Sequence, residues 1–223
     1  MASSIVFQYG TLFSRISRAL LFSSVLLSEW NTLKMDCWSP TIDLLPPSIR
    51  IDVLLLTSVR NAAQLRKALM ESDPRLENIA LIKAHLIIDP LQVHVAANKS
   101  IMADSRDKKN TRSLSTEVIF NLSSTKNITA SLQTFGIGDD DQNLIAVIFD
   151  DIASISSESD RNERKNKFLD LVDGSVSTNM EDLSEITDLD AITKAHKLKH
   201  LAGDRDKLTR LLISRSAAKD LIF

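Results

Sequence analysis

The sequence predicts a single-domain α/β (α+β) protein, in which a small, mostly antiparallel sheet of about four strands is flanked by six or seven helices. Two apolar runs, residues 49–59 and 144–149, have the unbroken apolar character of strands that are buried on both faces. Segments with apolar residues at helical spacing lie between and after these runs. With 223 residues, 43% hydrophobic and 25% charged, the chain is large enough for one domain with a substantial core.

The helices expected after the first strand are marked by capping residues and prolines. Ser58 can cap a helix, and Pro74 would follow the end of that helix. A second strand is expected near residues 84–88. Asp89 and Pro90 then supply an N-cap and a first-turn proline, which predicts a long helix directly after them.

The middle of the chain contains one ambiguous segment. Residues 107–110 are a polar break, and residues 113–122 could form a strand or a helix on propensity alone. The resemblance described below favours a helix, which we predict there. Asn127 is expected to cap a short helix that Gly136 closes from the first position beyond its end. The apolar run that follows is predicted to be a buried central strand.

The C-terminal third is more polar. Residues 154–167 are hydrophilic and charged, and we predict a solvated loop that leads into a helix. Gly174 is expected to begin a turn into an edge strand. Thr187, with Asp190 three residues later, resembles a capping box, and Asp204 is expected to cap the final helix.

The N-terminal residues 1–34 differ from the remainder. They contain three basic residues, a single acid, many serines and a short apolar run, a composition typical of an organellar transit peptide. An upstream start with Met35 as the true beginning, or a structural extension, would also explain them. We therefore divide the chain into an extension, residues 1–34, and a domain, residues 35–223. No run approaches the ~18 apolar residues that cross a bilayer, and the single cysteine, Cys37, excludes an internal disulfide.

Residues for catalysis or metal binding are not arranged in any recognisable pattern. No serine is flanked by glycines, no phosphate-cradling loop occurs, and Gly136 with Gly138 lacks the third glycine of a dinucleotide-binding turn. His196 and His200 have the spacing of two metal ligands, but no third ligand is close in sequence. We interpret them as solvated histidines near a helix end. The sequence thus predicts no catalytic residues, no metal and no cofactor.

Four segments resemble the PRPK-binding protein family, known as TPRKB in animals. They read DPLQ (89–92), VAANK (95–99), TRSLSTEVIFNLS (111–123) and FGI (135–137), and the resemblance extends over residues 42–223. It implies a non-catalytic accessory subunit of the KEOPS (EKC) complex, which binds the PRPK-type kinase and supports threonylcarbamoyladenosine modification of tRNA. It also implies residence in the nucleus and cytosol, whereas residues 1–34 leave organellar targeting open.

Two alternatives to this function come from other classes. The chain would be an organellar binding protein of the same fold with a different partner, or an enzyme with an unrecognised site. The final helix is the candidate kinase contact, since its apolar residues form more than one stripe, which indicates either core packing or a second buried face. The candidate kinase-binding residues are Leu208, Leu212, Ile213, Ala217 and Leu221.

A tRNA contact would require a local basic patch, because the net charge of −2 gives no overall attraction to a polyanion. Two predicted helices and the polar break between them carry basic residues that the fold can bring together. Phosphate contact would be the chemistry of such a patch, and an ordinary solvated surface is the alternative. The candidate tRNA-binding residues are Arg60, Arg66, Lys67, Lys99, Lys108, Lys109 and Arg112.

Overall fold

Two buried strands, β1 (Ile49–Thr57) and β3 (Leu144–Asp151), pair in the middle of a four-stranded sheet. β2 (Ile79–Lys83) pairs with the other side of β3, and the short β4 (Ser175–Val176) pairs with β1. The strand order is β2-β3-β1-β4, and all three pairings are antiparallel. The predicted fold class is therefore confirmed, including the central place of the strand that begins at Leu144.

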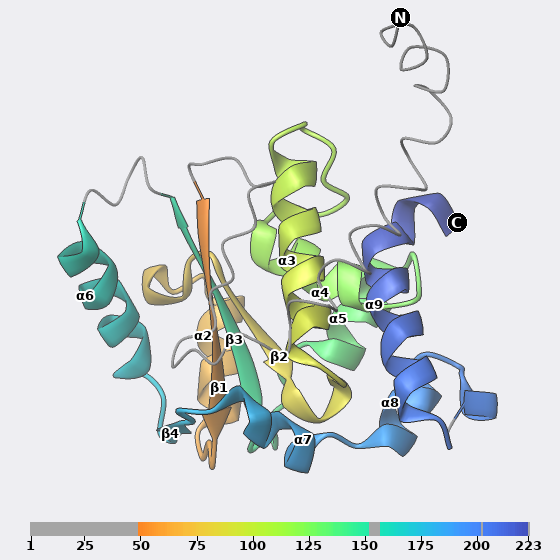
Figure 1. The fold of residues 1–223 in the computed structure, drawn as a ribbon. Helices are drawn as coiled ribbons and strands as arrows, with labels where there is room; N and C mark the ends of the chain where they lie inside the picture. The colour runs from red at the N-terminus through yellow and green to blue at the C-terminus, as the bar shows by residue number, and fades with distance from the viewer. Residues whose placement is uncertain (1–48, 152–156, 202, 223) are drawn as a thin grey trace, which may run out of the picture.

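Helices cover both faces of this sheet (Figure 1). The computed structural model describes residues 49–151, 157–201 and 203–222, with side chains up to Lys219, so that residues 1–34 and 35–48 lie outside it. The helices in the described residues are α2 (Ala62–Met70), α3 (Pro90–Asp104), α4 (Leu114–Leu122), α5 (Ile128–Phe135), α6 (Glu158–Leu169), α7 (Leu183–Ile186), α8 (Leu189–Ala195) and α9 (Arg205–Ile222). α2 and α6 lie on one face, and α3, α4, α8 and α9 pack on the other.

The two faces of β1 contribute to two separate apolar cores. Leu54 and Leu56 pack with residues of α2 and α6, whereas Val53 and Leu55 pack with residues of α3, α4, α8 and α9. Successive side chains of a strand point to opposite faces, so a strand with helices on both sides needs apolar residues at every position. This explains why the sequence of β1 is continuous in its apolar character instead of alternating.

The starts of α3 and α5 were correctly predicted from their caps, and α4 has a cap that was not predicted. Asp89 Oδ1 accepts a hydrogen bond from the backbone N–H of Leu91 at 2.8 Å, and Pro90 is the first residue of α3. The segment with mixed propensity forms α4, capped by the Ser113 hydroxyl. Asn127 caps α5 in the same way. In each case the side chain satisfies a backbone N–H that the first turn of a helix leaves without a partner.

Other local predictions were wrong. The second strand is β2 and not residues 84–88, which begin with the single 3₁₀ turn Ala84–Leu86. Residues 84–88 are all buried except His85, and most of β2 is buried as well. Apolar character alone therefore does not reveal which part of residues 79–88 pairs with β3. Residue 58 does not cap α2, because the N-cap position is Asn61.

Two further caps also differ from the prediction. The Thr187 hydroxyl donates to the carbonyl of Ile87 at 2.9 Å, while Asp188 caps α8. Gly136 ends α5 but has a φ of −71°, outside the left-handed region in which glycine is commonly required. A Cβ atom at this position would lie 2.6 Å from the carbonyl oxygen of Leu132, so close approach to the helix explains the glycine.

The charged segment predicted as a loop contains the helix α6. Arg161 forms ion pairs with Asp52 on β1 and with Asp150 on β3, and Arg164 Nη1 lies 2.8 Å from Asp150 Oδ1. Both carboxylates are buried, and burial raises the pKa of Asp150 although the two arginines oppose this shift. α6 thus packs on the sheet partly through buried ion pairs, and a hydrophobic pattern does not detect such contacts.

His196 is buried, whereas the sequence predicted a solvated histidine. It is 3% exposed at the end of α8, its ring lies 5.3 Å from that of Phe135, and neither ring nitrogen has a hydrogen-bond partner in the described part of the chain. Burial lowers the pKa of His196 to about 4, and the positive charges of Arg215 and Lys219 on α9 act in the same direction. His196 is therefore neutral in the native state at pH 7.

The buried His196 predicts a loss of stability at acidic pH. An unfolded chain binds a proton at His196 below about pH 6.5, whereas the native state binds it only near pH 4. The contribution of His196 to native-state stability is therefore complete above pH 6.5 and decreases as the pH falls toward 4. The difference between the two pKa values corresponds to about 3 kcal/mol. Chemical denaturation measures the unfolding free energy at pH 7 and at pH 4.5. The loss of unfolding free energy between these two pH values should be smaller by roughly 2–3 kcal/mol in His196→Phe than in the wild type. His200→Gln, a change at an exposed histidine, should retain the wild-type difference.

Candidate functional site

The apolar residues of α9 face the domain. Leu208 and Leu212 belong to the main core, and Ile213, which is 4% exposed, packs with Leu91 and Val95 of α3. Ala217 is half-buried against the same small cluster. Of the two open interpretations of this helix, core packing applies to Leu208, Leu212 and Ile213.

The outward face of α9 is polar or small. Arg210 is exposed, and Ser214, Ala217 and Ala218 are partly exposed. Leu221 lies one helical turn after Ala217, and its side chain is outside the described residues. Arg210 and Ser214 were not predicted from sequence as contact residues, because neither adds to an apolar stripe.

The basic residues of the predicted tRNA-binding set do not form one surface. Those on α2 and just before it are matched by acids: Arg60 pairs with Asp173, Arg66 with Asp139 and Lys67 with Glu71, at 2.7, 2.8 and 3.8 Å. α2 also lies on the face of the sheet opposite to α3. The sheet thus separates these three cations from the other four.

The remaining cations lie on α3 and in the connection between α3 and α4, residues 105–113, which we call the cationic loop. Lys99 is half-buried on α3, and Lys109 pairs with Asp104. In the described chain, no carboxylate lies within ion-pair distance of three exposed cations of the loop, which are Arg106, Lys108 and Arg112. Arg106 was missed by sequence reasoning, although it belongs to the same basic run.

The cationic loop is at the end of α3 that lies away from α7 and α8, uppermost in Figure 1. Its backbone is anchored to the buried Glu117 of α4. Glu117 was recognised from sequence as a polar group that the fold could hold, but its partners were not predicted, because they lie six and seven positions before it, beyond the reach of any capping pattern. The loop therefore presents its cations from an anchored backbone.

A polar hollow of roughly 690 Å³ lies at the start of α2. Its lining includes Arg60 and the acidic residues 139–141. Within the described residues, no three His, Cys, Asp or Glu side chains are arranged to hold a metal ion. The described helices also include none that is both long and apolar enough to span a membrane.

Both surfaces lie inside a region that matches a known family. Residues 56–220, from the end of β1 to the last turn of α9, match the family described as Kinase binding protein CGI-121. The chain belongs to this family. The resemblance inferred from the four sequence segments is therefore confirmed.

Similar proteins carry corresponding names. An EKC/KEOPS complex subunit TPRKB from Danio rerio is 30% identical over 171 residues, which cover 75% of this chain and 90% of the relative. An EKC/KEOPS complex subunit cgi121 from Aspergillus fumigatus is 28% identical over 76% of this chain and 88% of its own length. An EKC/KEOPS complex subunit cgi121 from Schizosaccharomyces pombe is 27% identical over 68% of this chain and 84% of its own length. The match to these family members includes the cationic loop and most of α9.

The burial of Ile213 predicts that a charge at this position destabilises the domain. Ile213→Glu should lower the free energy of unfolding by about 3–5 kcal/mol, because it places an unpaired carboxylate between α9 and α3. Arg210→Glu, three residues earlier on the exposed face, should change it by less than about 0.5 kcal/mol. Urea denaturation monitored by circular dichroism measures both, and an Ile213→Glu protein as stable as Arg210→Glu would show that Ile213 is not a core residue.

Proposed function

We propose that this chain is a non-catalytic subunit of an EKC/KEOPS-type complex, which binds a PRPK-type kinase and supports threonylcarbamoyladenosine modification of tRNA. The observation that carries the proposal is the match of residues 56–220 to a kinase-binding family. Two relatives that align over 90% and 88% of their own lengths are named as subunits of that complex, which supports the same role here. In this proposal residues 35–223 form the binding domain, and residues 1–34 do not take part in binding.

The outward face of α9 is our proposed kinase contact. Arg210, Ser214, Ala217 and Leu221 are separated by four, three and four positions, so they follow one another along a single helix face. Small side chains at residues 214 and 217 allow a partner to approach the helix closely. The buried Leu208, Leu212 and Ile213 contribute indirectly, because they fix α9 on the domain.

A double substitution on this face tests the kinase contact. Arg210→Glu with Ser214→Glu should weaken kinase binding at least about tenfold, a loss of about 1.4 kcal/mol or more, because it places two new negative charges in the interface. The melting temperature should remain close to that of the wild type, since these side chains do not belong to the core. Isothermal titration with the purified kinase measures the affinity.

The matched control for this experiment is Gln64→Glu, an exposed position of α2 on the other side of the sheet. It should bind the kinase with wild-type affinity. A folded double variant that also binds normally would place the contact elsewhere. Failure of the wild-type chain to bind any PRPK-type kinase would contradict the proposed function itself.

The cationic loop is our proposed tRNA contact. Its exposed cations, Arg106, Lys108 and Arg112, form no ion pair within the described residues, and the loop stays net positive although Asp107 lies between the first two, so these cations are available to phosphate groups. Contacts of this kind are independent of sequence and weaken as salt increases, because bound cations are released from the RNA. Of the seven residues predicted from sequence, we retain Lys108 and Arg112 as contacts, whereas Lys109 is paired with Asp104 and the Nζ atom of Lys99 is buried.

Charge reversal in this loop should weaken binding of a tRNA transcript and flatten its salt dependence. The triple variant Arg106→Glu, Lys108→Glu, Arg112→Glu removes up to three phosphate contacts, so the slope of log K against log salt should decrease in magnitude by about 2–3. The control triple, Arg60→Glu, Arg66→Glu and Lys67→Glu, alters three cations that already have acidic partners. Fluorescence anisotropy at several salt concentrations measures both, and equal slopes in the two triples would contradict a loop-specific contact.

The cellular location follows from the same proposal. A subunit of this complex would act in the nucleus and cytosol, whereas an organellar binding protein of the same fold would be directed elsewhere by residues 1–34. Imaging of a chain tagged at its C-terminus separates the two. Mitochondrial or plastid fluorescence, lost on deletion of residues 1–34, would favour the organellar protein.

A further inference from the structure

The cationic loop is anchored by a carboxylate that forms no ion pair with any lysine or arginine among the described residues. Glu117 is 1% exposed and accepts four hydrogen bonds from two loop residues. Glu117 Oε2 accepts from the backbone N–H of Asn110 (3.1 Å), the backbone N–H of Thr111 (2.8 Å) and the Thr111 hydroxyl (2.7 Å), while Oε1 accepts from the Asn110 amide (3.2 Å). All four donors are neutral groups, and hydrogen bonds to an ionised carboxylate are stronger than those between neutral partners.

Neutral donors leave the cations of the loop available. Lys108 and Arg112 flank the anchored residues Asn110 and Thr111, and both are exposed. A buried carboxylate is commonly satisfied by an ion pair, which here would have turned a loop cation inward. Instead, Glu117 fixes the backbone between two cations whose side chains face solvent.

We infer that Glu117 is a positioning residue for RNA phosphate groups, because it fixes the backbone at residues 110 and 111, between Lys108 and Arg112. The backbone N–H groups of Arg106 and Lys108 are bonded to the Ala103 carbonyl of α3, so the effect of Glu117 is expected chiefly on the side of Arg112. The inference rests on the RNA contact proposed above and names what that contact requires, which is a loop backbone held in place by Glu117. A loop that is already ordered loses less conformational entropy when it binds, so its affinity is higher than that of a mobile loop with the same charges.

Two physical effects of Glu117 on RNA binding have opposite signs. Its negative charge lies close to the phosphate-binding cations, so a purely electrostatic role would make binding tighter when the charge is removed. A positioning role makes binding weaker when the hydrogen bonds are removed. The direction of the change in affinity therefore distinguishes positioning from simple electrostatics.

Three variants of the full chain separate these effects with an unmodified tRNA transcript as the probe. Glu117→Ala should bind about tenfold more weakly, because all four bonds are lost. Glu117→Gln should recover most of the affinity, since its carboxamide oxygen can replace Oε2 and the Asn110 amide can rotate to accept from the new NH₂ group. Thr111→Val retains the charge of Glu117 but lacks the hydroxyl, and it should weaken binding about threefold. The salt slope should remain that of the wild type in all three, because the cations are unchanged.

Hydrogen exchange provides the structural readout. The backbone amides of Asn110 and Thr111 should exchange faster in Glu117→Ala and return toward wild-type rates in Glu117→Gln. Leu65→Ala, a core change on the opposite face of the sheet, controls for general loss of stability and should leave RNA affinity unchanged. If Glu117→Ala does not fold, the weaker binding expected for Thr111→Val remains the test.

The failures of the inference and of the proposed function give different results. Tighter or unchanged RNA binding by Glu117→Ala, or unchanged binding by Thr111→Val, would overturn the positioning role while the charge-reversal triple still weakens binding. If the charge-reversal triple itself binds like the wild type, the RNA contact of the loop is wrong and the positioning role is lost with it.

Discussion

The antiparallel pairing of β1 with β3 is the constraint on which the remaining structure depends. Nearly every side chain of these two strands is buried, so neither face of the pair can be left to solvent. α2 and α6 must cover one face, and α3, α4, α8 and α9 must cover the other. This arrangement also decides which surface residues can cooperate, since basic residues on α2 and α3 are separated by the thickness of the sheet and its two helical layers.

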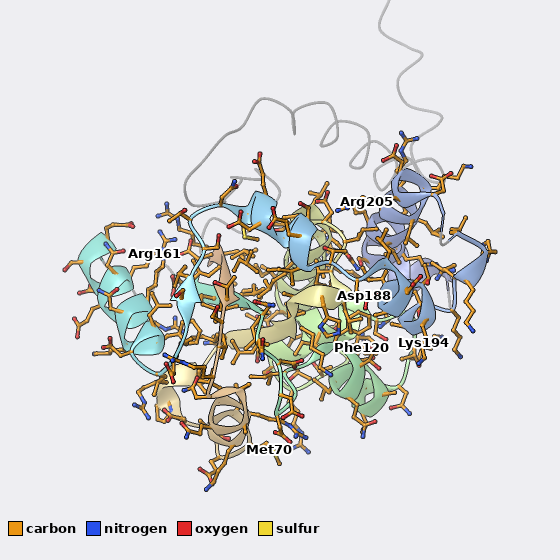
Figure 2. The ribbon with its side chains drawn as sticks, turned by 90° about the horizontal axis from the view of Figure 1, so that it is seen from below. Met70, Phe120, Arg161, Asp188, Lys194 and Arg205 are labelled. Carbon is orange, nitrogen blue, oxygen red and sulfur yellow. The ribbon has the colours of Figure 1, made fainter. Side chains whose placement is uncertain are left out.

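Buried polar groups are stabilised in three different ways around this framework. Arg161 and Arg164 pair with Asp52 and Asp150 and bring a very polar helix onto the sheet. Figure 2 shows Arg161 on the opposite side of the molecule from Arg205 at the start of α9. Glu117 is stabilised by neutral donors, and His196 is stabilised as the uncharged form. The cost of burying an isolated charge explains why each group has either partners or a shifted pKa.

The two proposed contact surfaces depend on this buried framework, and Ala217 belongs to both the framework and the proposed face of α9. α9 is fixed through Ile213 and the core leucines, which leaves its polar face available to a partner. The cationic loop is fixed through Glu117, which leaves its basic side chains available to phosphate. Both arrangements would suit the binding role proposed above, because each holds a surface in a fixed position.

The sequence by itself determined the α+β class, the two central strands and the helices that begin at Pro90 and Ile128, because these depend on local apolar runs and on caps within a few residues. The helix that begins at Leu114 was ambiguous on propensity and was predicted from the family resemblance. It also identified the family from short contiguous segments. The tertiary structure decided that α6 is a helix, that Ile213 faces the core and that Glu117 anchors a loop. Each of these depends on contacts between residues on different elements or beyond the span of a cap, and periodicity within one segment contains no information about what will pack against it.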